Sequence, residues 1–142
     1  MNYRTLTSRY TALLSFVLLF MFVSCKEEET TTVQNSSVII NIPTLNINWG
    51  TIVFGQNSDQ TYIFTNNTTS GDKLKGTVKI TGNGFYIVTG GGGYTLLAGQ
   101  SRLVKLRFFP DRRGSFTGTL KIEHNAGNKA SPINIALAGS AQ

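Results

Sequence analysis

The sequence predicts an all-β domain, built as an antiparallel sandwich, over residues 38–142. Short apolar runs alternate there with clusters of Gly, Asn, Asp and Ser, a spacing that is typical of strands joined by turns. Several runs alternate apolar and polar residues, and we find no segment with a long helical period. This pattern places one face of each sheet in the core and the other in water.

The strands are expected in eight runs of the sequence. In order they are 38–42, 45–49, 60–66, 74–80, 85–88, 102–109, 115–123 and 132–138. The alternation is clear in the sixth run, where Val104, Leu106 and Phe108 fall on one side and Lys105 and Arg107 on the other. Seven or eight strands in roughly 100 residues are typical of an Ig-like β-sandwich.

Residues 1–24 have the composition of a secretory signal peptide. Arg4 and Arg9 precede the apolar run TALLSFVLLFMFVS, which is shorter than the roughly 20 residues that a membrane-spanning helix needs. The chain's single cysteine, Cys25, follows this run directly, so no disulfide can form within the chain. We therefore expect cleavage near this cysteine rather than a transmembrane anchor.

FVSC, residues 22–25, resembles the lipobox of bacterial lipoproteins. The resemblance implies cleavage after Ser24, a diacylglycerol on the Cys25 thiol, and a further fatty acyl chain, such as palmitate, on the new α-amino group. Cys25 is then a tether to the membrane, neither a ligand nor a nucleophile. Stable anchoring needs more than one acyl chain, and this modification supplies two or three.

The charges after the cysteine resemble the export signal of some Gram-negative surface lipoproteins. Lys26, Glu27 and Glu28 follow Cys25 directly. The resemblance implies a protein of the outer membrane, exposed at the cell surface, with the periplasmic face as the alternative. A purely solvating role for these charges is the other interpretation. Residues 25–37 as a whole are polar and without apolar periodicity, so we expect a flexible stalk there.

Five segments of the expected domain together resemble an Ig-like family. They are WGTIVFGQ (49–56), FTNNT (64–68), GFYIV (84–88), LLAGQSRLVKLRFFPDRRGSFTGTLKI (96–122) and INIALAGSA (133–141). Over residues 45–141 they are similar to the choice-of-anchor D, or ASH/Hydin-type, domain. Pro110 and Gly114 match the family's corner between two strands, whereas Ala98 stands where the family usually has proline. The resemblance implies that Trp49 is a core residue and that the domain is a structural or interaction module.

The sequence offers little material for catalysis or metal binding. The single histidine, His124, follows a strand and is expected at the surface. Of the four acids in residues 38–142, all but Glu123 are expected in turns, where aspartate is favoured for backbone reasons; these three are Asp59, Asp72 and Asp111. The sequence shows no nucleophile motif and no metal-ligand spacing. We therefore expect no enzymatic activity, no metal and no cofactor.

The segment TGGGGYT, residues 89–95, invites comparison with a phosphate-binding loop. It lacks the Lys and Ser/Thr of a P-loop and is not followed by a helix. We interpret it as a mobile loop or a bulged hairpin.

Basic residues are in excess, and the chain has a net charge of +6. In Ig topology Lys105 and Arg107 fall on one sheet, while Lys75, Lys79 and Lys121 fall on the other. Such a scatter lacks the stripe and interleaved aromatics of a nucleic-acid interface. We expect no nucleic-acid partner, and an acidic polysaccharide is the alternative use of this charge.

Aromatic and basic residues supply the candidate contact patch. Tyr86 and Tyr94 flank the glycine run, and Arg112 and Arg113 cluster at a corner. The main hypothesis is a non-enzymatic, lipid-anchored envelope protein whose Ig-like domain acts in protein interaction, structure or adhesion, with an unknown envelope protein as partner. The alternative is a glycan-binding accessory lipoprotein of the cell surface, with tyrosine rings stacking on sugar.

Overall fold

The computed structural model describes residues 37–142. The expected signal peptide, Cys25, and the charges at Lys26, Glu27 and Glu28 lie outside the described residues and stay predictions. Within residues 37–142 there is no helix of the length and apolar character that crossing a bilayer requires.

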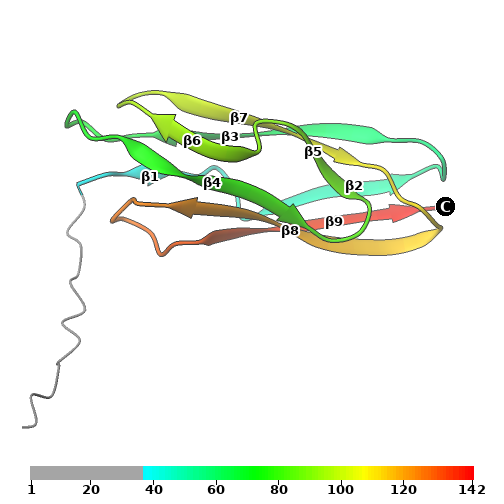
Figure 1. Ribbon diagram of the computed structural model, residues 1–142. Coiled ribbons are helices and arrows are strands. Elements are labelled where there is room, and N and C mark those ends of the chain that lie inside the picture. The colour runs from blue at the N-terminus through cyan, green and yellow to red at the C-terminus, as the bar shows by residue number, and fades with distance from the viewer. Residues whose placement is uncertain (1–36) are drawn as a thin grey trace, which may run out of the picture. The chain divides into compact units, whose positions relative to one another are not determined.

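The described chain folds into two β-sheets packed face to face (Figure 1). Sheet A has the order β1 (Ile40–Asn41), β3 (Ser58–Asn66), β7 (Ser101–Phe108), β5 (Phe85–Thr89). Sheet B has the order β2 (Asn46–Ile52), β9 (Ile133–Ala141), β8 (Gly114–His124), β4 (Leu74–Thr81), β6 (Gly92–Leu96). A strand forms in each of the eight predicted runs, so the predicted all-β, Ig-like sandwich is confirmed.

One strand pair departs from the antiparallel expectation. Among the paired strands of the described chain, β2 and β9 run parallel, with Asn46 beside Ala136 and Ile52 beside Ala141. Parallel neighbours need a long connection, and here it contains the six strands between β2 and β9. The register shifts between Asn48 and Thr51, a bulge at the edge of sheet B.

The core is the layer between the sheets, filled by alternate residues of each strand. In β7, Val104, Leu106 and Phe108 are fully buried, whereas Lys105 and Arg107 are only partly covered. The predicted alternation is therefore confirmed, as is the assignment of these two cations to a different sheet from the lysines of β4 and β8.

Trp49 on β2 is part of an aromatic cluster that joins the two sheets. Its ring centroid lies 5.4 Å from that of Phe85 and 6.1 Å from that of Phe108, both in sheet A. Its indole Nε1 donates a hydrogen bond to the carbonyl of Ser58 at 2.9 Å. A buried indole N–H needs such a partner, so the bond fixes the ring in the core. The predicted core position of Trp49 is confirmed.

The glycine run carries the chain from one sheet to the other. β5 ends beside β7 in sheet A, and β6 begins at Gly92 beside β4 in sheet B. Gly90 has φ +83, and a Cβ there would lie 2.1 Å from the carbonyl oxygen of Leu103, so only glycine fits. The interpretation of this segment as a mobile loop or bulged hairpin is wrong. The strand β6 was missed because glycine has low β propensity, and its pairing with β4 forms through backbone groups.

Candidate interaction surface

The outer face of sheet A carries five large apolar side chains that are between 41% and 50% exposed. They are Ile63 on β3, Tyr86 and Val88 on β5, Leu103 on β7 and Phe109 just after β7. We call this surface, together with the charged residues Asp59, Lys105 and Arg107 at its centre, the A face. Outward positions of a water-facing sheet are normally polar, so this accumulation needs an explanation.

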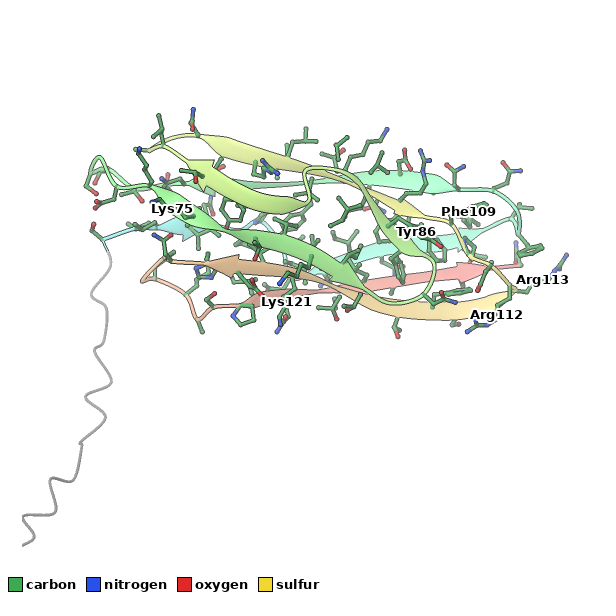
Figure 2. The ribbon with its side chains drawn as sticks, in the orientation of Figure 1. Lys75, Tyr86, Phe109, Arg112, Arg113 and Lys121 are labelled. Atoms are coloured by element: carbon green, nitrogen blue, oxygen red, sulfur yellow. The ribbon has the colours of Figure 1, made fainter. Side chains whose placement is uncertain are left out.

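The strand register brings these side chains together. Ile63 lies directly opposite Leu103, and Tyr86 lies opposite Arg107. The amide of Phe109 donates to the carbonyl of Gly84 at 2.8 Å, which places Phe109 beside the start of β5. Figure 2 shows the side chains of Tyr86 and Phe109 toward the same end of the domain. Because opposite residues of paired strands share a face, the A face runs across three adjacent strands.

A cluster of three charges occupies the centre of the A face. Asp59 accepts hydrogen bonds from Arg107 Nε at 2.7 Å and Nη2 at 3.0 Å, and Lys105 Nζ lies 3.0 Å from Asp59 Oδ2. The Arg107 guanidinium, and next the Lys105 ammonium, hold the pKa of the Asp59 carboxyl well below its usual range. Asp59 was expected in a turn, but it belongs to β3. One carboxylate faces two cations here, so the cluster keeps a net positive charge.

Arg112 and Arg113 lie in the turn between β7 and β8, at the end of the domain where Figure 2 shows Phe109. The Arg112 guanidinium lies over the ring of Phe116, 5.0 Å from its centroid, and Nη1 is 3.4 Å from Asp111 Oδ1. β7 ends before Pro110, and Gly114 has φ +119, so the predicted corner is confirmed. The two arginines are exposed and extend the charged area beyond Phe109.

Tyr94 does not belong to any surface patch. It is 6% exposed, its ring centroid lies 5.1 Å from that of Phe64, and its hydroxyl donates to the carbonyl of Glu123 at 2.9 Å. Burial raises the pKa of Tyr94 to about 12. The expectation that Tyr94 is exposed is wrong, because its place in β6 points it into the core. Tyr86 is exposed, so it is the one tyrosine of the predicted patch that lies at the surface.

Sequence reasoning missed most of the A face, although a signal for it was present. On β3, Ile63 lies between the inward residues Tyr62 and Phe64, at a position where the alternation predicts a polar residue. Leu103 on β7 and Phe109 just after it break the polar alternation in the same way. An apolar residue at an outward position is therefore the signal, but it has meaning only when neighbouring strands repeat it.

His124 is buried, contrary to the expectation of a surface histidine. It is 7% exposed, because the inward period of Leu120 and Ile122 on β8 continues to it. Its Nδ1 accepts a hydrogen bond from the amide of Ala126 at 3.1 Å. Burial lowers the pKa of His124. Within the described part of the chain, no group of three or more His, Cys, Asp or Glu is placed to hold a metal ion.

Neither a protein-family model nor a curated protein matches this sequence. Solved structures do match its fold. The ASH/PapD-like domain of human CEP192 superposes with a TM-score of 0.62 at 14% identity, covering 75% of this chain and 88% of that domain. A protein of unknown function from Porphyromonas gingivalis W83 gives 0.58 at 14% identity, covering 72% of this chain and 46% of the other. The VesB protease of Vibrio cholerae gives 0.53 at 14% identity, covering 74% and 32%.

These similarities support an Ig-like β-sandwich fold. At such identities they establish the fold alone. The chain spans less than half the length of the Porphyromonas and Vibrio proteins, whereas it matches most of the CEP192 domain. The ASH part of the family resemblance is thus in agreement with the structure.

Proposed function

We propose that the protein is a non-enzymatic, lipid-anchored envelope protein of a Gram-negative bacterium whose Ig-like domain is a protein-interaction module. The observation that carries this proposal is the A face, with its five exposed apolar side chains around a charged centre. Large exposed apolar patches on soluble domains mark binding surfaces. The choice-of-anchor D resemblance supports the same class of function.

The composition of the A face favours a protein partner. Tyr, Phe and Arg are enriched in the centres of protein interfaces, and Tyr86, Phe109 and Arg107 supply them here. Fully burying one such apolar side chain contributes about 1.5–3 kcal/mol. The net positive charge at Lys105 and Arg107 favours a partner surface that pairs apolar side chains with a carboxylate.

The location of the protein is part of the same proposal. FVSC supports lipid attachment at Cys25, and Lys26, Glu27 and Glu28 support export to the outer surface of the outer membrane. Mass spectrometry of the mature N-terminal peptide is expected to show an acylated Cys25, and Cys25→Ser is expected to leave the membrane fraction. An unmodified Cys25 in membrane-bound protein would contradict the lipid anchor.

Cross-linking in cells, followed by pull-down of the tagged full-length protein, tests the interaction. We expect a near-stoichiometric protein partner that is lost in the double variant Tyr86→Ser/Leu103→Ser. The matched control is Leu45→Ser/Val53→Ser, which removes two exposed apolar side chains outside the A face. Equal recovery of the partner with both double variants would show that the A face is not the binding surface.

A glycan-binding accessory lipoprotein remains the alternative function. This alternative rests on Tyr86, which is exposed, and on Arg112 and Arg113, the basic residues of the candidate contact patch that the sequence predicted. Without Tyr94 the patch offers one tyrosine ring for stacking on a sugar. Retention on a polysaccharide affinity gel that Tyr86→Ala abolishes, in a protein that captures no protein partner, would favour this alternative.

A further inference from the structure

An open polar hollow of about 540 Å³ lies at the end of the domain where the described chain begins. Its lining includes residues from three places that are distant in sequence: Ser37, then Asp72, Lys73 and Lys75, and finally Asn125 after β8. It is separate from the A face, because sheet B supplies its strand residues.

The side chain of Asn125 forms hydrogen bonds with the backbone of the two lysines of the hollow, Lys73 and Lys75. Its Oδ1 accepts from the amide of Lys75 at 2.8 Å, and its Nδ2 donates to the carbonyl of Lys73 at 3.1 Å. The amide of Asn125 also donates to the carbonyl of Lys75 at 3.2 Å. Lys73 directly precedes β4 and Lys75 is the second residue of that strand, and both line the hollow.

The charges around the hollow are unbalanced. Among residues 37–142, the ion pairs involve Lys79, Lys105, Arg107 and Arg112, and neither lysine of the hollow takes part in one. Asp72 also lines the hollow, but its carboxylate accepts hydrogen bonds from the hydroxyls of Ser37 and Ser70. These hydroxyls lower the pKa of Asp72, so it stays charged. Two ammonium groups against one carboxylate leave the hollow with a net positive charge.

We propose that this hollow binds a phosphate group, with Lys73 and Lys75 as the residues that contact its oxygens. A concave site with two unpaired ammonium groups concentrates a multiply charged anion, and charge-assisted hydrogen bonds to phosphate are among the strong ones. The phosphate can belong to a phospholipid headgroup or to a free phosphate. The headgroup source depends on the proposed lipid anchor. If Cys25 is anchored in the membrane, Ser37 lies within about 40 Å of it, because twelve residues of fully extended chain reach no further.

Titration of the full-length protein in a non-ionic detergent tests the proposal. Inorganic phosphate is expected to bind saturably, and Lys73→Gln/Lys75→Gln is expected to weaken binding at least tenfold. The matched control is Lys79→Gln/Lys121→Gln, which removes two lysines that lie opposite each other on β4 and β8. Figure 2 shows Lys75 and Lys121 in different parts of the domain. Asp72→Asn removes the carboxylate that repels phosphate, so this variant is expected to bind more tightly.

A second titration separates the two sources of phosphate. Tighter binding to micelles that contain short-chain phosphatidylglycerol than to dissolved glycerol phosphate, with the same dependence on Lys73 and Lys75, supports a headgroup. Equal affinity for both supports a free phosphate. The absence of saturable binding by any of these probes overturns the proposal, as does an equal loss of affinity in both lysine double variants. Neither result bears on the A face, so the protein-interaction proposal is tested independently.

Discussion

Arg102 on β7 donates a hydrogen bond from its guanidinium Nε to the carbonyl of Gly90, at 3.1 Å, and so fixes the point where the chain leaves sheet A. Its Nη2 donates to the next carbonyl, that of Gly91, at 3.0 Å. The chain segment held in this way follows β5 directly, and β5 carries Tyr86 and Val88. The contact therefore links the crossover between the sheets to the position of two A-face side chains.

Gly90→Ala is expected to destabilise the domain more than Gly92→Ala. Both glycines have positive φ, +83 and +76, but an added Cβ at Gly90 meets the Leu103 carbonyl oxygen at 2.1 Å. At Gly92 no atom lies within 4 Å of the added Cβ. The control therefore reports backbone strain alone, about 1–2 kcal/mol. Urea denaturation of the two variants measures the difference, and equal stabilities would contradict the crossover geometry.

Asn66→Ala is expected to lower the free energy of unfolding by about 3 kcal/mol, because several buried groups lose their partners. The Asn66 amide donates to the carbonyls of Asp72 at 3.1 Å and Leu96 at 3.0 Å, and its oxygen accepts from the amide of Thr68 at 3.1 Å. Asn67→Ala, at an exposed neighbouring side chain, is the control and is expected within about 0.5 kcal/mol of wild type. Similar denaturation curves for both variants would show that the Asn66 side chain does not stabilise the segment between β3 and β4.

Tyr94→Phe is expected to destabilise the domain by about 1 kcal/mol, whereas Tyr86→Phe is expected to leave its stability unchanged. The Tyr94 hydroxyl donates to the carbonyl of Glu123 near the end of β8, and the substitution removes this hydrogen bond. Tyr86 is exposed on the A face. Thermal unfolding of the two variants distinguishes a structural tyrosine from a surface one, and a stability loss confined to Tyr86→Phe would reverse their assignments.

The stability of the domain is expected to fall as the pH drops below about 6.5, the ordinary pKa of histidine. Burial lowers the pKa of His124 in the folded state, so the unfolded chain takes up a proton first. The stability that neutral His124 contributes is present above pH 6.5 and is lost as the pH falls through the folded pKa. Denaturation across pH 5 to 8 measures this slope for wild type and His124→Gln. An identical slope in the variant would mean that other groups cause it.

The candidate surface was partly predictable from the sequence. Tyr86, Arg112 and Arg113 could be placed at the surface because they lie near turns or at polar positions of the alternation. Ile63 and Leu103 could not be recognised as a pair, since an apolar residue at an outward position has meaning only when a neighbouring strand repeats it. Their meeting depends on the register between β3 and β7, which pairs residues about 40 positions apart in sequence.

The sequence by itself determined the class of the fold, eight of the nine strands of the described chain and, for β7, the side that faces the core. It could do so because both signals are local. Side chains alternate between the two faces of a strand with a period of two residues, and turn residues mark where strands end. Phe108 and Gly114 were assigned correctly on this basis, whereas the core position of Trp49 was expected from the family resemblance.

Only the tertiary structure decided which strands are neighbours. The parallel pairing of β2 with β9, the change of sheet at Gly90 and the burial of Tyr94 all follow from contacts between distant segments. Local alternation shows which residues share a face of one strand, but it does not show which other strand lies beside that strand. The A face and the lysine hollow exist because several strands meet, and they therefore become visible only in the folded domain.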